Sequence, residues 1–297
     1  MTTVSNDSPV LGSDLKAPTF SSRHVTVIQP THGWAVFDLA EFWRYRDLFL
    51  ALAARDVKLR YRQTALGVIW VLVQPLVASV IFTVLFSKVA NFPSGHVPYF
   101  LLTLTGSLGW TAFQNTMTKT SNSLIGNAQL VSKVYFPRLI LPLSTVVSSL
   151  IDFAVCFVVM IALLIVYRVT PHLGFLLFPV WLLLMLMQAI GFGLYAGALM
   201  VSYRDIQYVL PIVIQMGAFA TPVYYSMAFA AEKTPSISWF FYMNPLSGLL
   251  EAMRWSILSL PGPNLGTLLY SVIASVLIFI GGVMMFRRME RKFADVI

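Results

Sequence analysis

Charged residues are scarce in this chain of 297 residues, since Asp, Glu, Lys and Arg together make up 11% of it. A soluble domain carries roughly 25% charged residues. Hydrophobic residues instead make up 58% of the chain. The composition therefore excludes a soluble globular protein and predicts a protein that crosses a membrane several times.

Cysteine, nucleotide-binding and metal-binding patterns are also nearly absent. The one cysteine, Cys156, excludes an intrachain disulfide, and its apolar neighbours predict a small buried residue. No G-x-x-x-x-G-K-[ST] motif occurs, so ATP-driven activity would need another subunit. No Cys/His spacing suits zinc, because the histidines are scattered at His24, His32, His96 and His172. We therefore expect no metal and no cofactor in this chain.

Long runs with few or no charges are the main positive feature. A bilayer core about 30 Å thick takes roughly 20 apolar residues per helix. Runs of this length cover residues 63–87, 89–118, 139–167, 173–203, 206–231 and 265–286, with a turn expected near 93–98. The sequence therefore predicts an all-α polytopic membrane protein with six transmembrane helices in a domain at 63–286.

Lys and Arg near the ends of these runs predict the orientation, because cytoplasmic loops are enriched in them. With the N-terminus inside, the opposite side receives only Lys88, Arg168, Lys233 and Arg254. We therefore expect a multi-pass membrane protein with both termini cytoplasmic. The formal charge of +8 follows from this bias and from contact with anionic membrane lipids, and does not indicate nucleic acid as a partner.

The segments around the spans differ in composition. The polar residues 1–33 lack the apolar core of a signal peptide and predict a disordered or loosely ordered cytoplasmic tail. Residues 34–62 mix aromatic and charged side chains, which favours an interfacial amphipathic helix. Residues 119–138 predict a cytoplasmic elbow suited to docking a partner, 224–260 short re-entrant helices, and 287–297 a second cytoplasmic tail.

Asp152 is the only acid deep in a predicted span. A charge placed there costs several kcal/mol, so an intramembrane acid is a candidate functional residue. Two interpretations stay open. Asp152 is either a coupling site for ions or a helix-packing residue that hydrogen-bonds Ser148, Ser149 or a facing helix.

Neutral polar residues fall on single helical faces in three spans, at about 100° per residue. Thr103, Ser107, Thr111, Gln114 and Thr118 align on the second span, where we expect contacts between helices. On the first and fifth spans, aromatic and amide groups favour the lining of a channel for a sugar polymer. The aligned residues are Gln63, Gly67, Trp70 and Gln74 on the first span, and Gln207, Pro211, Gln215, Ala218, Pro222 and Tyr225 on the fifth.

From about Ile28 to the C-terminus the sequence resembles the ABC-2 type permeases of bacterial O-antigen, capsule and teichoic acid exporters. The most specific pieces are Trp43-Arg44-Tyr45-Arg46-Asp47, Arg55-Asp56-Val57-Lys58-Leu59-Arg60-Tyr61-Arg62-Gln63-Thr64, Leu66-Gly67, Trp70 and Gln74-Pro75. Further pieces are Lys133-Val134-Tyr135-Phe136-Pro137-Arg138, Tyr203-Arg204-Asp205, Thr221-Pro222-Val223-Tyr224, Asn244-Pro245-Leu246 and Glu251-Ala252-Met253-Arg254-Trp255.

This resemblance implies a homodimer bound to two cytoplasmic ATPase subunits that hold ATP and Mg²⁺, and a lipid-linked polysaccharide as substrate. It implies ATPase coupling through Lys133, Tyr135, Phe136, Pro137 and Arg138, and an outward gate with Tyr224, Glu251 and Arg254. The substrate's diphosphate would need cations at the cytoplasmic entrance. Arg55, Lys58, Arg60 and Arg62 are candidates, although membrane anchoring or ATPase contact would explain them as well.

Three other functions remain open from the sequence. An ABC-2 permease for another lipid or a small molecule would share the topology. A membrane-embedded glycosyltransferase would need carboxylates near one membrane face, where the outer loops offer only Glu232 and Glu251. An ion-coupled transporter would use Asp152.

Overall fold

Every regular element in the described part of the chain is a helix, as expected where hydrocarbon leaves backbone groups no water to bond. The computed structural model describes the backbone of residues 39–62, 68–233 and 235–296. The helices named below belong to one compact unit. The prediction of an all-helical, multi-span protein is confirmed.

Four helices are long and apolar enough to cross a membrane. The first is α3 (Val68–Thr83) with its π-helical extension η1 (Val84–Val89), and the second is α6 (Ile140–Val166). The others are the 3-10 turn η3 (Leu173–Leu177) with α7 (Phe178–Ser202), and α12 (Leu265–Val296). They agree with the first, third, fourth and sixth predicted spans.

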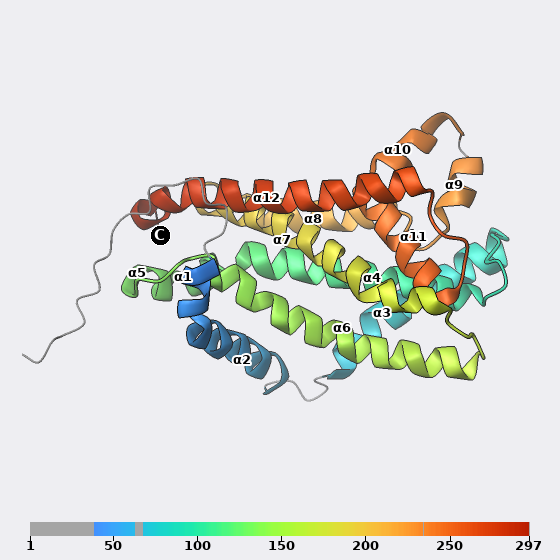
Figure 1. Cartoon of the computed structure of the whole chain (residues 1–297), viewed down its shortest axis with the longest axis horizontal. Helices are drawn as coiled ribbons and strands as arrows, with labels where there is room; N and C mark the ends of the chain where they lie inside the picture. The colour runs from blue at the N-terminus through green and yellow to red at the C-terminus, as the bar shows by residue number, and fades with distance from the viewer. Residues whose placement is uncertain (1–38, 63–67, 234, 297) are drawn as a thin grey trace, which may run out of the picture. The chain divides into compact units, whose positions relative to one another are not determined.

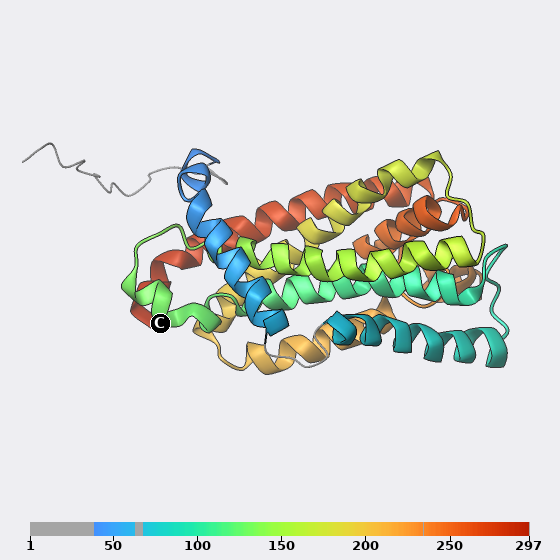
Figure 2. The same ribbon diagram turned by 90° about the horizontal axis from the view of Figure 1, so that it is seen from below.

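The second predicted span corresponds to α4 (Tyr99–Asn122), which is long but too polar to count among those four. It packs against α7, α6, α3 and α11 and lies between them in both views (Figures 1 and 2). Thr103 and Ser107 of its polar face are buried, as the predicted helix contacts require. Thr103 and Thr105 also donate to carbonyls one turn earlier, which satisfies their hydroxyl groups.

The fifth predicted span is shorter than expected. The helix α8 (Ile206–Ala220) ends at Ala220 instead of Ala231, so Pro222 and Tyr225 lie in a turn and not on its polar face. Thr221 is extended at ψ 143°, and Pro222 has no N–H to continue the helix. With α4 polar and α8 short, the number of six crossings stays a prediction.

A proline inside α3 explains the position of the single cysteine. Pro75 has no N–H, so the carbonyl of Val71 loses its helical partner. Cys156 on α6 is buried, and its Sγ donates to this carbonyl at 3.4 Å. Cys156 is therefore buried, as predicted. Its thiol also donates a hydrogen bond from α6 to α3.

The segment before the first span forms two helices, α1 (Leu39–Arg44) and α2 (Arg46–Arg62), separated at Tyr45. α2 packs against α6, which it crosses at a steep angle in Figure 2. The predicted elbow contains the last turn of α4, the 3-10 turn η2 (Ile125–Asn127) and α5 (Ala128–Lys133). α12 continues to Val296, so residues 287–296 extend a helix. The predicted tail at 1–33, Gln63 and Gly67 lie outside the described residues.

The segment at 224–260 forms short helices, as predicted. These are α9 (Met227–Lys233), the 3-10 turn η4 (Pro235–Ile237), α10 (Ser238–Met243) and α11 (Pro245–Leu258). Asn244 caps α11 by accepting from the N–H of Leu246, and Pro245 begins the helix, where its missing N–H costs nothing. α9, α10 and α11 lie at the end of the bundle opposite α5 (Figure 1).

Candidate functional site

A buried acid joins α2, α4 and α6 at the end of the bundle that carries α2. Asp152 on α6 is 2% exposed. Its Oδ2 lies 2.9 Å from Lys119 Nζ on α4, and its Oδ1 lies 2.8 Å from Arg60 Nε on α2. Tyr61 donates its hydroxyl to Oδ1 at 2.8 Å, and Lys119 also donates to Ser148. We call Arg60, Tyr61, Lys119, Ser148 and Asp152 the inner cluster.

The inner cluster satisfies the physical requirement for a buried carboxylate, which must be paired and hydrogen-bonded. The N–H of Arg60 Nε is not aligned with this contact, so Arg60 makes an ion pair rather than a directed hydrogen bond. Burial and the hydrogen bond to Asp152 raise the pKa of Tyr61 from 10.0 to about 12, so its hydroxyl remains a donor well above neutral pH. The acid therefore has two cations and one neutral donor.

Only one of the partners expected for Asp152 is found. Ser148 reaches the acid through Lys119 instead of bonding it, and Ser149 Oγ has no hydrogen-bond partner among the described residues. Asp152 does bond facing helices, and its donors are Lys119 and Tyr61. Both were missed because the sequence places them at the membrane edge, 33 and 91 positions from Asp152.

The four entrance cations have different environments. Arg60 is engaged by Asp152, and Arg55 donates from Nη2 to Asp56 and to Asn127 of η2, each at 2.8 Å. Lys58 and Arg62 are exposed and form no salt bridge in the described part of the chain. Two cations thus fix α2 to its neighbours, and two are accessible to a ligand.

A buried base at the opposite end organises the gate candidates. Arg254 on α11 is fully buried. Its Nη2 donates to the carbonyls of Pro222 at 2.8 Å and Val223 at 2.6 Å, and its Nη1 donates to Tyr225 O at 3.0 Å. Glu251 Oε1 lies 3.3 Å from Nη1 and accepts from the Met227 N–H.

We call Arg254, Glu251 and the turn 222–225 the outer cluster. Glu251 and Arg254, three residues apart on α11, form an ion pair, but the carbonyl partners were not predicted. These carbonyls lie in the turn after α8, which ends at Ala220, and buried carbonyls outside a helix need donors from elsewhere. Gly106 on α4 permits this arrangement, because a Cβ there would overlap Val223 O and Arg254 Nη2.

Aromatic rings connect the C-terminal ends of α3 and α8 to this turn. Phe82 on α3 stacks on Tyr224 with ring centroids 3.7 Å apart, and it also meets Phe219 on α8. Tyr99 donates its hydroxyl to Tyr224 O at 3.0 Å. The gate candidate Tyr224 is therefore held by both stacking and its backbone.

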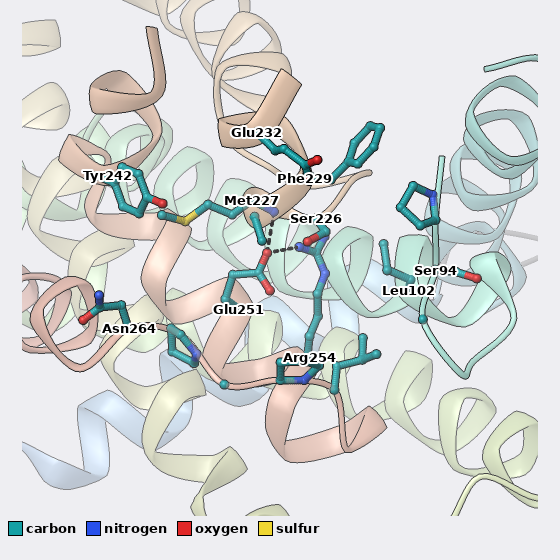
Figure 3. Close-up of a pocket in the computed structure, with 17 residues that line it drawn as sticks. Ser94, Leu102, Ser226, Met227, Phe229, Glu232, Tyr242, Glu251, Arg254 and Asn264 are labelled. Atoms are coloured by element: carbon teal, nitrogen blue, oxygen red, sulfur yellow. Dashed lines mark hydrogen bonds and ion pairs between the residues drawn. The ribbon is translucent and has the colours of Figure 1, made fainter. Parts of the chain in front are cut away.

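A cavity of about 460 Å³ lies beside the outer cluster. Figure 3 shows Glu251 near its centre, with Glu232, Tyr242 and Asn264 around it. The remaining wall is mostly apolar and comes from 93–95, 227–229 and 260–263. Glu232 and Glu251, far apart in sequence, thus line one space.

The channel-lining candidates differ in how far their side chains are exposed. Trp70 and Gln74 on α3 are exposed in the single chain, as is Gln215 on α8. Gln207 and Tyr225 are half-buried, whereas Ala218 is 6% exposed and belongs to the core.

The coupling candidates divide in a similar way. Lys133 and Tyr135 are exposed, Tyr135 to 69%, whereas Phe136 packs in the core with Leu52 and Phe286. Pro137 and Arg138 are half-buried, and Arg138 Nη1 donates to Glu290 O on α12 at 2.7 Å. The elbow is thus anchored by Phe136 and Arg138, and Tyr135 projects from it.

No group of three or more His, Cys, Asp or Glu residues that could hold a metal ion occurs among the described residues. In the described part of the chain, Asp152 is surrounded by cations instead of other acids. The sites therefore suit ion pairing and polar contact.

Comparison with known proteins covers most of the chain. Residues 47–258 match the model of the family described as ABC-2 type transporter. One similar protein, the O-antigen export system permease protein RfbA of Klebsiella pneumoniae, is 28% identical over 258 residues, which is 84% of this chain and 95% of that protein. The RfbA protein of Myxococcus xanthus is 26% identical over 255 residues, which is 86% of this chain and 97% of that protein.

Proposed function

Because the chain belongs to the ABC-2 type transporter family, we propose that it is the membrane subunit of an ATP-driven exporter of lipid-linked polysaccharide. Members of this family are transmembrane permease subunits that carry no cofactor. The ATPase of such systems is a separate subunit. The observation that carries the substrate class is the similarity to O-antigen export permeases over 84–86% of the chain. We place the permease in the bacterial inner membrane with both termini cytoplasmic.

The proposed channel lies where two copies of the chain bring α3 and α8 together. In one copy, the faces of α3 with Trp70, Gln74 and Ile81 and of α8 with Tyr208 and Gln215 are exposed. A polymer must slide without being held tightly, which neutral amide and aromatic groups permit and buried charges do not. Gln63, Gly67 and Gln207 remain candidates, and Ala218 is left out because it is buried.

The proposed entrance uses the accessible cations of α2. Lys58 and Arg62 are free to bind the diphosphate of the lipid carrier, while Arg55 and Arg60 hold α2 against η2 and α6. In this mechanism ATPase closure moves α2 and the elbow together, since Arg55 and Asn127 join them. The inner cluster passes that movement to α4 and α6, and the turn at 222–225 gates the outer end.

Two experiments test the proposed function. We expect gently extracted protein to co-purify with an ATPase subunit, and deletion of the gene to abolish surface polysaccharide while polymer accumulates inside the cell. Normal surface polysaccharide after deletion, together with no ATPase in the purified sample, contradicts an exporter. Loss of a different exported lipid with intact surface polysaccharide favours the alternative substrate.

Tyr135→Ala tests the coupling role of the elbow. Because Tyr135 is exposed and packs in no core, we expect normal folding but at least fivefold less polymer exported per ATP hydrolysed. Val134→Ala, which changes an exposed neighbour, is the matched control. Unchanged coupling in Tyr135→Ala would remove this side chain from the mechanism.

A further inference from the structure

The cavity beside the outer cluster combines features of a ligand site. Pockets for small molecules are mostly apolar, carry a few convergent polar groups and typically measure about 300–1,000 Å³. This cavity has a volume of about 460 Å³ and a lining of that kind. Ser226, Tyr242, Glu251 and Asn264 supply polar groups from four separate segments (Figure 3).

One oxygen in the cavity is fixed and unused. Glu251 Oε1 is held by Arg254 and by the Met227 N–H, but Oε2 accepts no hydrogen bond in the described part of the chain. Glu251 lines the cavity, its side chain is 13% exposed, and the two contacts of Oε1 hold the carboxylate in place. A preorganised acceptor of this kind suits a hydroxyl donor, since a ligand without one would leave it unpaired.

The charge balance selects against anions. Arg254 lines the cavity, but Nη1 and Nη2 of its guanidinium are already bonded to Glu251 and the three turn carbonyls. Only its buried Nε has no hydrogen-bond partner among the described residues. Among the described lining residues, Glu232 and Glu251 then contribute two carboxylates, and Arg254 is the one basic side chain. Lys233 Nζ lies over the ring of the lining residue Phe229, 5.6 Å from its centroid. A neutral polyhydroxylated ligand fits better than a phospholipid headgroup or a lipid diphosphate.

A continuous row of aromatic rings leads from the proposed channel to the cavity. Measured between ring centroids, Phe86 on η1 lies 6.0 Å from Tyr225 and 5.0 Å from Phe92. The ring centroid of Phe92 in turn lies 4.4 Å from that of Phe229 in the cavity wall. Aromatic faces pack against the apolar C–H face of a sugar ring while leaving its hydroxyls free to bond. The row therefore connects the outer ends of α3 and α8 with the fixed acceptor.

We propose that this cavity is a saccharide-binding site that holds a short neutral stretch of the polymer as it leaves the channel. This inference rests on the proposed export function and adds an outer sugar site to it. Glu251 Oε2 accepts a sugar hydroxyl, Glu232 and Asn264 offer further polar contacts, and Phe229 and Tyr242 offer ring faces.

The test uses the purified permease with its ATPase subunits. The probe is a set of neutral oligosaccharides released by acid from the cell's own surface polymer, and binding is measured by saturation-transfer NMR and calorimetry. We expect saturable binding that weakens at least fivefold in Glu232→Gln and in Tyr242→Ala. Both variants leave the pair of Glu251 and Arg254 intact. Asp205→Asn, an exposed acid outside the cavity, is the matched control and should bind as the wild type does.

The outcomes distinguish failure of the saccharide site from failure of the proposed export function. If deletion of the gene abolishes surface polymer but the probe does not bind, or both variants bind as tightly as the wild type, the saccharide site is overturned and the exporter stands. A phospholipid retained by the wild type and lost in Tyr242→Ala would overturn it as well, in favour of a lipid site. If deletion leaves surface polymer unchanged, the proposed function fails and this site fails with it.

Discussion

The inner and outer clusters each bury one charged residue almost completely, but they hold it in different ways. Asp152 is held by side chains from α2 and α4, two of which are partly open to solvent. Arg254 is held by backbone carbonyls of a single turn and by a carboxylate one helical turn away. Side-chain partners can rotate or exchange, whereas carbonyls move only with the chain. The inner cluster can therefore exchange partners when its helices move, and we call it the joint. The outer cluster moves only as a unit with its turn, and we call it the anchor.

Removing the anchor should have the largest effect. Arg254→Met leaves the three turn carbonyls without a donor and Glu251 without its cation, and breaking a buried pair in this way costs about 3–5 kcal/mol. We expect much less folded protein and a lower unfolding temperature in detergent. Stability equal to that of the wild type would show that the turn keeps its conformation without Arg254.

A substitution in the joint should cost less stability than one in the anchor. Asp152→Asn removes the charge that holds Arg60 and Lys119, but both cations reach water, so we expect a loss of about 2–3 kcal/mol. The double variant Asp152→Asn with Lys119→Met should lose less stability than the sum of its single changes, as a double-mutant cycle measures. Additive losses would mean that the two groups do not interact.

The same variant addresses the ion-coupled interpretation. If Asp152→Asn still exports polymer in proportion to its folded amount, the acid carries no coupled ion. Loss of export per folded protein with intact ATPase binding would instead indicate that the joint transmits movement.

A single methyl group at Gly106 should disturb the anchor without changing any charge. The Cβ of Gly106→Ala would overlap Val223 O and Arg254 Nη2, so the turn must shift, at a cost of about 1–3 kcal/mol. Gly281→Ala on α12 is the control, since nothing lies within 4 Å of its Cβ. Equal unfolding temperatures for the two variants would contradict the close contact.

The smallest effect is expected for Tyr61→Phe, which removes one neutral donor from the joint and costs about 1 kcal/mol. The pKa of Tyr61 is raised from 10.0 to about 12, so its contribution is present below pH 10 and is lost as the pH rises toward 12. The stability difference between the wild type and Tyr61→Phe should therefore shrink over that range. A constant difference up to pH 12 would mean that Tyr61 does not bond Asp152.

The sequence predicted local features of the fold well, because apolar runs and prolines act within one helix. The bounds of α6 and α7 and the short helices after α8 agree with expectation. The partners of Asp152 could not be predicted, since it meets Lys119 and Arg60 only after three helices pack. The difference between Tyr135 and Phe136 was also invisible, because adjacent aromatic residues look alike until one of them is covered by α12.

The polar central position of α4 has a consequence for how the protein enters the membrane. A newly made α4 would expose its threonines and serines to hydrocarbon, where insertion of polar side chains is unfavourable. Its main covering helices, α6 and α7, are synthesised later. α4 should therefore become stable in the bilayer only after α7 is made, so the order of synthesis and the order of stable insertion differ in this chain.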